Sequence, residues 1–251
     1  MGEWMSDVTF VITSCGRRDL LDQTLQSLFD TDWSLFDCKI LVEDSGDPKM
    51  KEYLDQKYAD VFDLIIFNDV NIGKLKSIDA AYSYVKTKYV FHCEDDWFFY
   101  RQGFLKDSIK ILEHDENISM VSLRSYYWDF QYNSQLILDE RIDLENIAYY
   151  KLKDRNEKTP MNGFCLNPGL RKLQYQKNLG RLQDIGAEYL LSKAYLNDGK
   201  YMVLLENSAI NHIGWGEGLE DPGKEPLYYR KVKNLIKAFL NLFGAKYHLI
   251  N

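Results

Sequence analysis

The first hundred residues alternate short apolar runs with longer segments whose apolar positions recur at helical spacing. The run VTFVIT at 8–13 is rich in β-branched residues and predicts a buried strand. In the segment that follows, four leucines fall at helical spacing: Leu20, Leu21, Leu25 and Leu28. This stretch therefore predicts a strand followed directly by a helix.

The same alternation continues along the N-terminal part of the chain. Further strand patterns occupy 38–44, 63–69 and 88–96. Helical patterns lie between them at 48–60 and 74–87. Strands that alternate with helices imply right-handed crossovers, and they predict an α/β fold with a mainly parallel sheet flanked by helices.

The second half of the chain is less regular. Residues 120–160 mix aromatic side chains with alternating apolar positions, which predicts short strands or a hairpin that covers a pocket. We interpret 161–172, rich in Gly, Asn and Pro, as a loop that opens a helix. A helix is predicted at 186–199 and a strand at 201–207.

Composition and charge narrow the classes of partner. The 251 residues carry 31 basic and 38 acidic side chains, a net charge of −7 without a basic block, so nucleic acid is not expected as a partner. The four cysteines show no CxxC spacing, and we expect reduced thiols rather than a zinc site. No apolar run approaches the ~20 residues of a spanning helix, and the first ten residues lack the pattern of a signal peptide. We expect a cytoplasmic protein that forms one domain over 1–251.

Polar residues follow directly after the predicted strands. They read TSCGRR, EDSGD, NDVNIGK and EDDW. Because the carboxyl ends of parallel strands meet at one edge of a sheet, where such folds bind ligands, we expect one shared site there. The patterns GxxxxGK[ST] and GxGxxG are both missing from the sequence, which argues against a P-loop or a dinucleotide fold.

The densest negative charge of the chain is Glu94, Asp95 and Asp96, which lie between aromatic flanks in FHCEDDWFFY. Such flanks indicate partial burial, although a solvated acidic turn is the alternative. Crowded, partly buried carboxylates need a cation to remain ionised. Hard carboxylate oxygens suit Mg²⁺ or Mn²⁺, which predicts a metal site for a phosphorylated substrate.

Five segments, taken in order, resemble the motifs of a GT-A fold glycosyltransferase, most closely of glycosyltransferase family 2. They are FVITSCGRRDLLDQTLQSL, ILVEDSGD, NIGKLKSIDAAY, YVFHCEDDW and GAEYLLSKAYLNDGKYMVLLENSAINHIG. EDD resembles a variant of the DxD motif of these enzymes. The resemblance implies a Rossmann-like fold, a nucleotide-diphosphate-sugar donor, Mn²⁺ or Mg²⁺, and inversion at the anomeric carbon. It also implies a nucleotide-binding half at about 1–100 and a smaller acceptor and catalytic half at about 101–223.

The resemblance assigns the nucleotide-sugar site to residues near the strand ends. The matching positions are Thr13, Ser14, Gly16, Arg17, Glu43, Asp44, Asn71, Gly73 and Lys74. Arg17 would approach the diphosphate, and Asp44, next to Glu43, would accept from the base or the ribose. Ordinary roles stay open: a helix N-terminus after Ser14, a turn at Asp44, and a surface lysine at Lys74.

The resemblance also divides the acidic triplet. Asp96 matches the acid that reaches the cation, whereas Glu94 and Asp95 match acids that contact the ribose or the donor sugar. His212, in NSAINHIG, matches a histidine that completes the metal or diphosphate site in some relatives. A neutral imidazole is a competent ligand, and a structural histidine is the alternative.

Glu188 is implied as the catalytic base. It stands eleven residues before Gly199, as the acid of the family's ED motif does before its glycine. The sequence departs from that motif, because Ala187 replaces the preceding acid and Glu replaces the usual Asp. Asp184, one helical turn earlier, is the alternative base, and a carboxylate on a helix surface is the third reading.

Aromatic and polar side chains are candidates for the sugar and acceptor subsites. They are Trp97, Asn162, Gly163 and Asn167, together with Tyr126, Tyr127 and Trp128. Aromatic faces pack on the apolar faces of sugars, and ordinary core packing is the alternative for each ring.

The sequence thus predicts an inverting glycosyltransferase that acts on a glycan or lipid-linked acceptor hydroxyl. A nucleotidyltransferase on a related fold and a catalytically silent carbohydrate-binding or assembly subunit are the alternatives. Residues 224–251 predict an amphipathic C-terminal helix with a basic face. We expect it either to make a peripheral membrane contact or to pack on the core.

Overall fold

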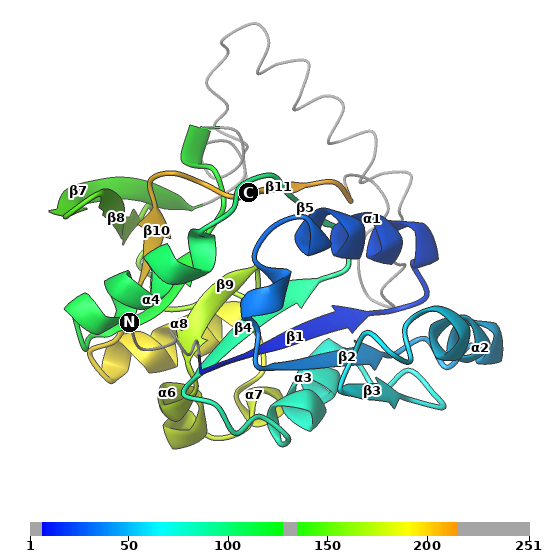
Figure 1. Ribbon diagram of the computed structural model, residues 1–251. Coiled ribbons are helices and arrows are strands. Elements are labelled where there is room, and N and C mark those ends of the chain that lie inside the picture. Colours follow the sequence, from blue (N-terminus) through cyan, green and yellow to red (C-terminus); the bar gives the residue numbers. More distant parts are fainter. Residues whose placement is uncertain (1–6, 128–134, 215–251) are drawn as a thin grey trace, which may run out of the picture. The chain divides into compact units, whose positions relative to one another are not determined.

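The computed structural model describes residues 7–127 and 135–214, and the chain up to His212 forms one compact unit. In these ranges one nine-stranded sheet has the order β3-β2-β1-β4-β9-β6-β10-β8-β7 (Figure 1). Its N-terminal strands are β1 Val8–Ser14, β2 Cys38–Glu43, β3 Leu64–Phe67 and β4 Tyr89–Glu94. Its later strands are β6 Ile118–Ser122, β7 Leu136–Leu144, β8 Ile147–Asp154, β9 Gly169–Lys172 and β10 Tyr201–Leu205.

The sheet is mainly parallel, which confirms the predicted α/β fold. Strands β1 to β4 run parallel to one another, and β6 runs parallel to β10. Strand β9 is antiparallel to both of its neighbours, β4 and β6, and β8 is antiparallel to β10 and β7. The register places Ser14 beside Glu43 and Thr13 beside Glu94. Polar residues at the ends of β1, β2 and β4 therefore meet at one edge, as the pattern predicted.

Helices cover both faces of the sheet (Figure 1). One face packs against α1 Arg18–Phe29, α2 Pro48–Lys57 and α4 Phe104–His114. The other face packs against α3 Lys74–Tyr82, α6 Leu173–Leu179, α7 Leu182–Ile185 and α8 Glu188–Asn197. Because successive strand residues point to opposite faces, Phe10 and Ile12 pack with the first group and Val11 with the second. A short 3₁₀ helix, Trp33–Leu35, follows α1.

A small second sheet lies beside the acidic triplet. Strand β5, Trp97–Phe99, pairs antiparallel with β11, Ile210–His212. In this register His212 lies opposite Trp97, directly after Asp96 in the chain. The second sheet thus brings a histidine from the C-terminal part of the unit to the acids that follow β4.

The second half of the unit both confirms and corrects the sequence prediction. The hairpin of β7 and β8, the helix α8 and the strand β10 are confirmed. The predicted loop is confirmed over 161–168, and helix α6 begins at Leu173, but Gly169–Lys172 between them forms β9 in the middle of the sheet. A Cβ at Gly169 would lie 2.4 Å from the carbonyl oxygen of Val121, so glycine allows β9 and β6 to approach.

Two further expectations concern helices. The predicted helix at 224–251 lies outside the described residues. Among the helices that are described, none has the length and apolar character needed to cross a membrane.

His92, in the middle of β4, is fully buried, and neither ring nitrogen has a hydrogen-bond partner among the described residues. Burial, reinforced by the charges of Arg171 and Lys74, holds the pKa of His92 well below 6.5. The folded protein therefore keeps this imidazole neutral where the unfolded chain would protonate it. That difference links stability to pH.

We expect stability to fall as the pH drops below about 6.5, because the unfolded state then binds a proton that the folded state excludes. The loss from His92 should approach about 1.4 kcal/mol per pH unit. His92→Leu should flatten this dependence between pH 7 and pH 5 in chemical unfolding experiments. The same substitution at the exposed His114 is the control. Equal pH dependence in wild type and His92→Leu would contradict the assignment.

Candidate active site

The acidic triplet lies where β4 ends and the chain passes into β5. Asp95 and Asp96 are 1% and 8% exposed, and Glu94 is partly buried. Carboxylates buried to this extent remain ionised only when cations or hydrogen-bond donors compensate their charge. The burial excludes a solvated turn for these two aspartates.

Arg17 pairs with both buried aspartates from the N-terminal end of α1. Its Nη1 donates to Asp96 Oδ2 at 2.8 Å, and its Nη2 bonds to Asp95 Oδ1. Ser14 Oγ also donates to Asp95, at 2.9 Å. Burial raises the pKa of Asp95 to about 6, against the opposing effects of Arg17 and Ser14. One guanidinium thus compensates both carboxylates and fixes their positions.

Asp96 and His212 form the pair that fits a metal ion. His212 Nε2 lies 3.4 Å from Asp96 Oδ2, and Asp96 Oδ1 is buried without a hydrogen-bond partner among the described residues. Burial alone would raise the pKa of Asp96, but the hydrogen bond of His212 and the charge of Arg17 hold it below its ordinary value. Carboxylate oxygen and imidazole nitrogen are suitable ligands for Mn²⁺.

The protein would supply only part of such a coordination shell. In the ranges that the structure describes, no three His, Cys, Asp or Glu side chains gather closely enough to hold a metal ion. Asp95 is directed to Ser14 and Arg17, and Glu94 bonds to Lys74. The pair fits a site that takes its other ligands from a bound diphosphate and water, as Mg²⁺ sites often do.

Asp44 holds the loop that precedes α3. Its Oδ1 accepts from the backbone N–H of Ile72 and from Asn68 Nδ2, at 2.9 and 2.8 Å. Its Oδ2 accepts from the backbone N–H of Gly73 at 2.9 Å. Both oxygens of Asp44 are therefore engaged in shaping this loop.

Glu43 is fully buried at the end of β2, and its two oxygens differ. Oε1 accepts from the backbone N–H groups of Gly16 and Ser45 at 2.8 and 2.9 Å. Oε2 is buried and has no partner among the described residues. A buried acceptor without a partner is costly, and it fits a donor group supplied by a ligand.

Two loops approach each other across this edge. Asn71 Nδ2 donates to Cys15 Sγ at 3.4 Å, which joins the loop before α3 to the loop after β1. Burial raises the pKa of Cys15 to about 11, and the charges of Glu43, Asp44 and Asp95 act in the same direction. The thiol is therefore protonated at neutral pH.

Lys74, at the start of α3, lies among several acids. Its ammonium group bonds to Glu94 Oε1. Burial would lower the pKa of Lys74, but Glu94 and, more weakly, Glu188 and Asp96 raise it. The side chain of Lys74 is 46% exposed, and its ion pair is with Glu94 at the end of β4.

Glu188 and Asp184 have different surroundings. Glu188, partly buried at the first position of α8, accepts from the backbone N–H of Leu166 at 2.7 Å. Asp184 is exposed and makes two hydrogen bonds with Arg181, at 2.8 and 3.1 Å. Ala187, which precedes Glu188, provides no side-chain cap for α8. Of the two carboxylates, Glu188 is the one that shares the surroundings of Lys74.

The residues predicted to bind the sugar or the acceptor differ in solvent exposure. Trp97 is 2% exposed and its ring lies 4.8 Å from that of His212. Gly163 is buried against α8, whereas Asn162 and Asn167 are partly exposed. Tyr126 and Tyr127 form an edge-to-face pair, and Tyr127 is 65% exposed. Trp128 lies outside the described residues.

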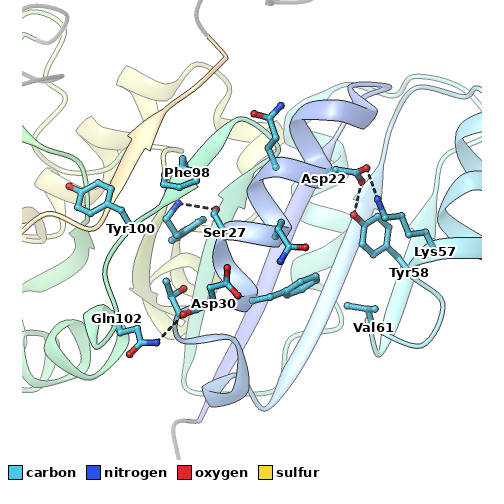
Figure 2. A pocket seen from close by; sticks show the side chains of 14 residues that line it. Asp22, Ser27, Asp30, Lys57, Tyr58, Val61, Phe98, Tyr100 and Gln102 are labelled. Atoms are coloured by element: carbon cyan, nitrogen blue, oxygen red, sulfur yellow. Dashed lines mark hydrogen bonds and ion pairs between the residues drawn. The ribbon is translucent and has the colours of Figure 1, made fainter.

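A pocket of about 840 Å³ lies between α1, the segment after α2 and the segment that contains β5 (Figure 2). None of the candidate site residues lines it. Many of its polar groups already bond to one another: Tyr58 and Lys57 bond to Asp22, and Gln102 donates to the carbonyl oxygen of Asp30 (Figure 2). The pocket's shape alone does not identify the functional site.

Sequence reasoning missed several residues that support the site. Asp79, on α3, accepts from the backbone N–H groups of Leu182 and Gln183 and so caps α7. Arg171, in β9, is buried and donates to the backbone of the loop that leads into this strand. Because Arg171 stands directly before Lys172 in GLRK, nothing in the sequence distinguished this buried arginine from its basic neighbour.

A sheet with polar strand ends and an acidic segment after β4 is the architecture of GT-A glycosyltransferases. The family model for glycosyl transferase family 2 matches residues 9–173. The chain belongs to this family. A search of curated protein sequences finds no match.

Solved structures with a similar fold include a mannosyltransferase. The mannosyltransferase PcManGT from Pyrobaculum calidifontis, in complex with GDP-Man and Mn²⁺, has a TM-score of 0.59 and 15% identity and covers 96% of this chain. GalNAc-T7 with UDP, GalNAc and Mn²⁺ has a TM-score of 0.64 and 14% identity over 94% of the chain. S. aureus TarS has a TM-score of 0.58 and 14% identity over 93% of the chain. This chain spans 65%, 48% and 40% of those three proteins.

Asp96→Ala should abolish the Mn²⁺- or Mg²⁺-dependent part of nucleoside diphosphate binding, because it removes the buried oxygen that fits the cation. Calorimetry with and without the metal measures this part separately. Asp19→Ala, which removes an exposed acid of α1, is the control and should bind as wild type does. Unchanged metal-dependent affinity in Asp96→Ala would rule out this residue as a ligand.

Proposed function

We propose that the protein transfers a sugar from a nucleotide-diphosphate-sugar to an acceptor hydroxyl, with inversion at the anomeric carbon. The observation that best supports this is the grouping of charges at the ends of β1 and β4. A network of ion pairs lies there, in which two buried aspartates share one guanidinium and Lys74 pairs with the neighbouring Glu94. Such a network suits a diphosphate bound together with a divalent cation.

The donor would lie across the loops at the ends of β1 and β2. Arg17 and Lys74 offer positive charge to the diphosphate, since both lie beside the acids that a cation would share. Glu43 Oε2 would accept from the base or the ribose, because it is a buried acceptor without a partner in the described part of the chain. Asp44 would keep the loop of Asn71 and Gly73 in place for the nucleotide.

Asp96 and His212 would hold Mn²⁺ or Mg²⁺, which would neutralise the charge that develops on the leaving diphosphate. Mn²⁺ is present in the complexes of PcManGT and GalNAc-T7. Asp95 would remain tied to Ser14 and contribute charge from behind the metal ligand. Glu94, bonded to Lys74, would face the donor sugar.

Glu188 would act as the general base. Its carboxylate would take the proton of the acceptor hydroxyl while that oxygen attacks the face of the anomeric carbon opposite the diphosphate. One displacement of this kind inverts the configuration. Asp184 is less suited, because Arg181 engages both of its oxygens on the exposed surface.

The acceptor would be a glycan or a lipid-linked sugar bound by the C-terminal half. Tyr127 offers an exposed aromatic ring for a sugar face, and Asn162 and Asn167 offer amide groups. We propose a cytoplasmic location, with a peripheral membrane contact through residues 224–251 where the acceptor is lipid-linked.

Glu188→Gln should lower sugar transfer by about a hundredfold to ten-thousandfold, because the amide keeps the size of the side chain but cannot accept the proton. Donor affinity should stay close to that of wild type. Asp184→Asn is the matched variant and should be milder. Transfer is measured as nucleoside diphosphate released with a panel of acceptors.

Loss of transfer in Asp184→Asn with near-normal turnover in Glu188→Gln would move the base to Asp184. Near-normal turnover in both variants would refute the single-displacement mechanism. Pyrophosphate as the released product would indicate the nucleotidyltransferase alternative. Nucleotide-sugar binding without any transfer would indicate a catalytically silent subunit, an alternative that Ala187 leaves open although the retained acids count against it.

A further inference from the structure

Arg171 is a buried cation in the middle of the sheet. It lies in β9 between Val90 of β4 and Met120 of β6, and it is 2% exposed. In the described part of the chain no carboxylate forms an ion pair with it. A guanidinium taken out of water without a carboxylate partner is costly unless hydrogen bonds compensate it. The hydrogen bonds of Arg171 must therefore compensate the cost of burying its charge.

The guanidinium holds the backbone of the segment that leads into β9. Its Nη2 donates to the carbonyl oxygens of Cys165 and Asn167, at 2.9 and 3.0 Å. Its Nη1 donates to the hydroxyl of Tyr82 on α3 at 3.0 Å. The guanidinium carbon Cζ lies over the ring of Phe164, 4.8 Å from the ring centroid. Two of the three hydrogen bonds thus go to main-chain atoms of residues 163–168, which we call the clamp segment.

The clamp segment lies tightly along α8. The backbone N–H of Gly163 donates to Ser192 Oγ at 2.9 Å, and a Cβ at Gly163 would lie 2.2 Å from the carbonyl oxygen of Ser192. The ring of Phe164 stacks on that of Tyr195 at 5.1 Å with an angle of 10°. Because the contacts are this close, a displacement of the clamp segment would also displace α8, the helix that begins at Glu188.

The clamp segment also contacts the carboxylate of Glu188 directly. The backbone N–H of Leu166 donates to Glu188 Oε1 at 2.7 Å, and within the described ranges no other hydrogen bond reaches this side chain. Leu166 lies between Cys165 and Asn167, the two residues whose carbonyl oxygens Arg171 holds. The carbonyl of Cys165 and the N–H of Leu166 belong to one peptide group, so the arginine holds the same peptide group that orients the carboxylate.

We propose that Arg171 is a positioning residue that holds the clamp segment so that the N–H of Leu166 keeps the Glu188 carboxylate in place to receive the acceptor proton. This inference rests on the proposed function, because Glu188 acts as the base only there. Among the described residues, Arg171 bonds to Tyr82, Cys165 and Asn167, and none of these belongs to the proposed donor or metal site. Its loss should therefore affect the acceptor-side step and leave donor binding intact.

The test compares Arg171→Met with Arg171→Lys, which keeps the charge but not the forked donors. Tyr82→Phe is the matched control, since it removes one partner of Arg171 and leaves both carbonyl contacts. Each folded variant is measured for hydrogen exchange of the amides of residues 163–167, for Mn²⁺-dependent nucleoside diphosphate affinity, and for the kcat and KM of transfer.

In Arg171→Met the amides of residues 163–167 should exchange at least about tenfold faster than in wild type. Its kcat should fall by about a hundredfold, the scale of a misplaced catalytic group, with nucleoside diphosphate affinity and donor KM within about twofold of wild type. Arg171→Lys should lie between, and Tyr82→Phe should resemble wild type. If Arg171→Met does not fold, the same measurements on Arg171→Lys decide the test.

Unchanged exchange of the clamp segment, or faster exchange with normal kcat, would overturn the proposal. A loss of nucleoside diphosphate affinity equal to the loss of kcat would also overturn it, because Arg171 would then support the whole fold. If wild type transfers no sugar from any donor, the proposed function fails separately, and exchange that is unchanged in Arg171→Lys would still refute the clamp.

Discussion

The site depends on one electrostatic constraint. Two carboxylates are buried at the edge of the parallel part of the sheet, and one guanidinium compensates the charge of both. Asp95 and Asp96 can be buried because Arg17 donates to both and Ser14 donates to Asp95. These contacts require β1 and β4 to end at the same level, and the register of the sheet provides this. A slip of one residue would turn the acids away from the guanidinium.

The C-terminal half completes this edge from three directions. Strand β11 brings His212 to Asp96, α8 brings Glu188 toward Lys74, and the segment before β9 holds Glu188 through a backbone N–H. Asp79 on α3 caps α7, so the helix that follows the loop of Asn71 and Gly73 also supports the segment that leads to α8. The proposed donor and acceptor sides are therefore joined by the contacts of Asp79 with α7 and of His212 with Asp96.

The sequence predicted the parts of this arrangement that depend on local pattern. The strands β1 to β4 and the acids at their ends follow from β-branched runs and polar termini, which the register brings together. Strand β9 was not predictable in this way, because it has four residues, contains Arg171 and forms only between β4 and β6. The different roles of Asp44 and Glu43 could not be predicted from the sequence either, because they depend on three-dimensional contacts. Both oxygens of Asp44 accept hydrogen bonds, whereas Oε2 of Glu43 is buried without a partner among the described residues.

The most direct test is a crystal structure with a nucleoside diphosphate and Mn²⁺, in which anomalous scattering locates the metal. The account predicts an anomalous peak beside Asp96 and His212, and Arg17 in contact with the diphosphate. Manganese bound elsewhere, or a diphosphate that leaves Arg17 and Lys74 without contact, would contradict it.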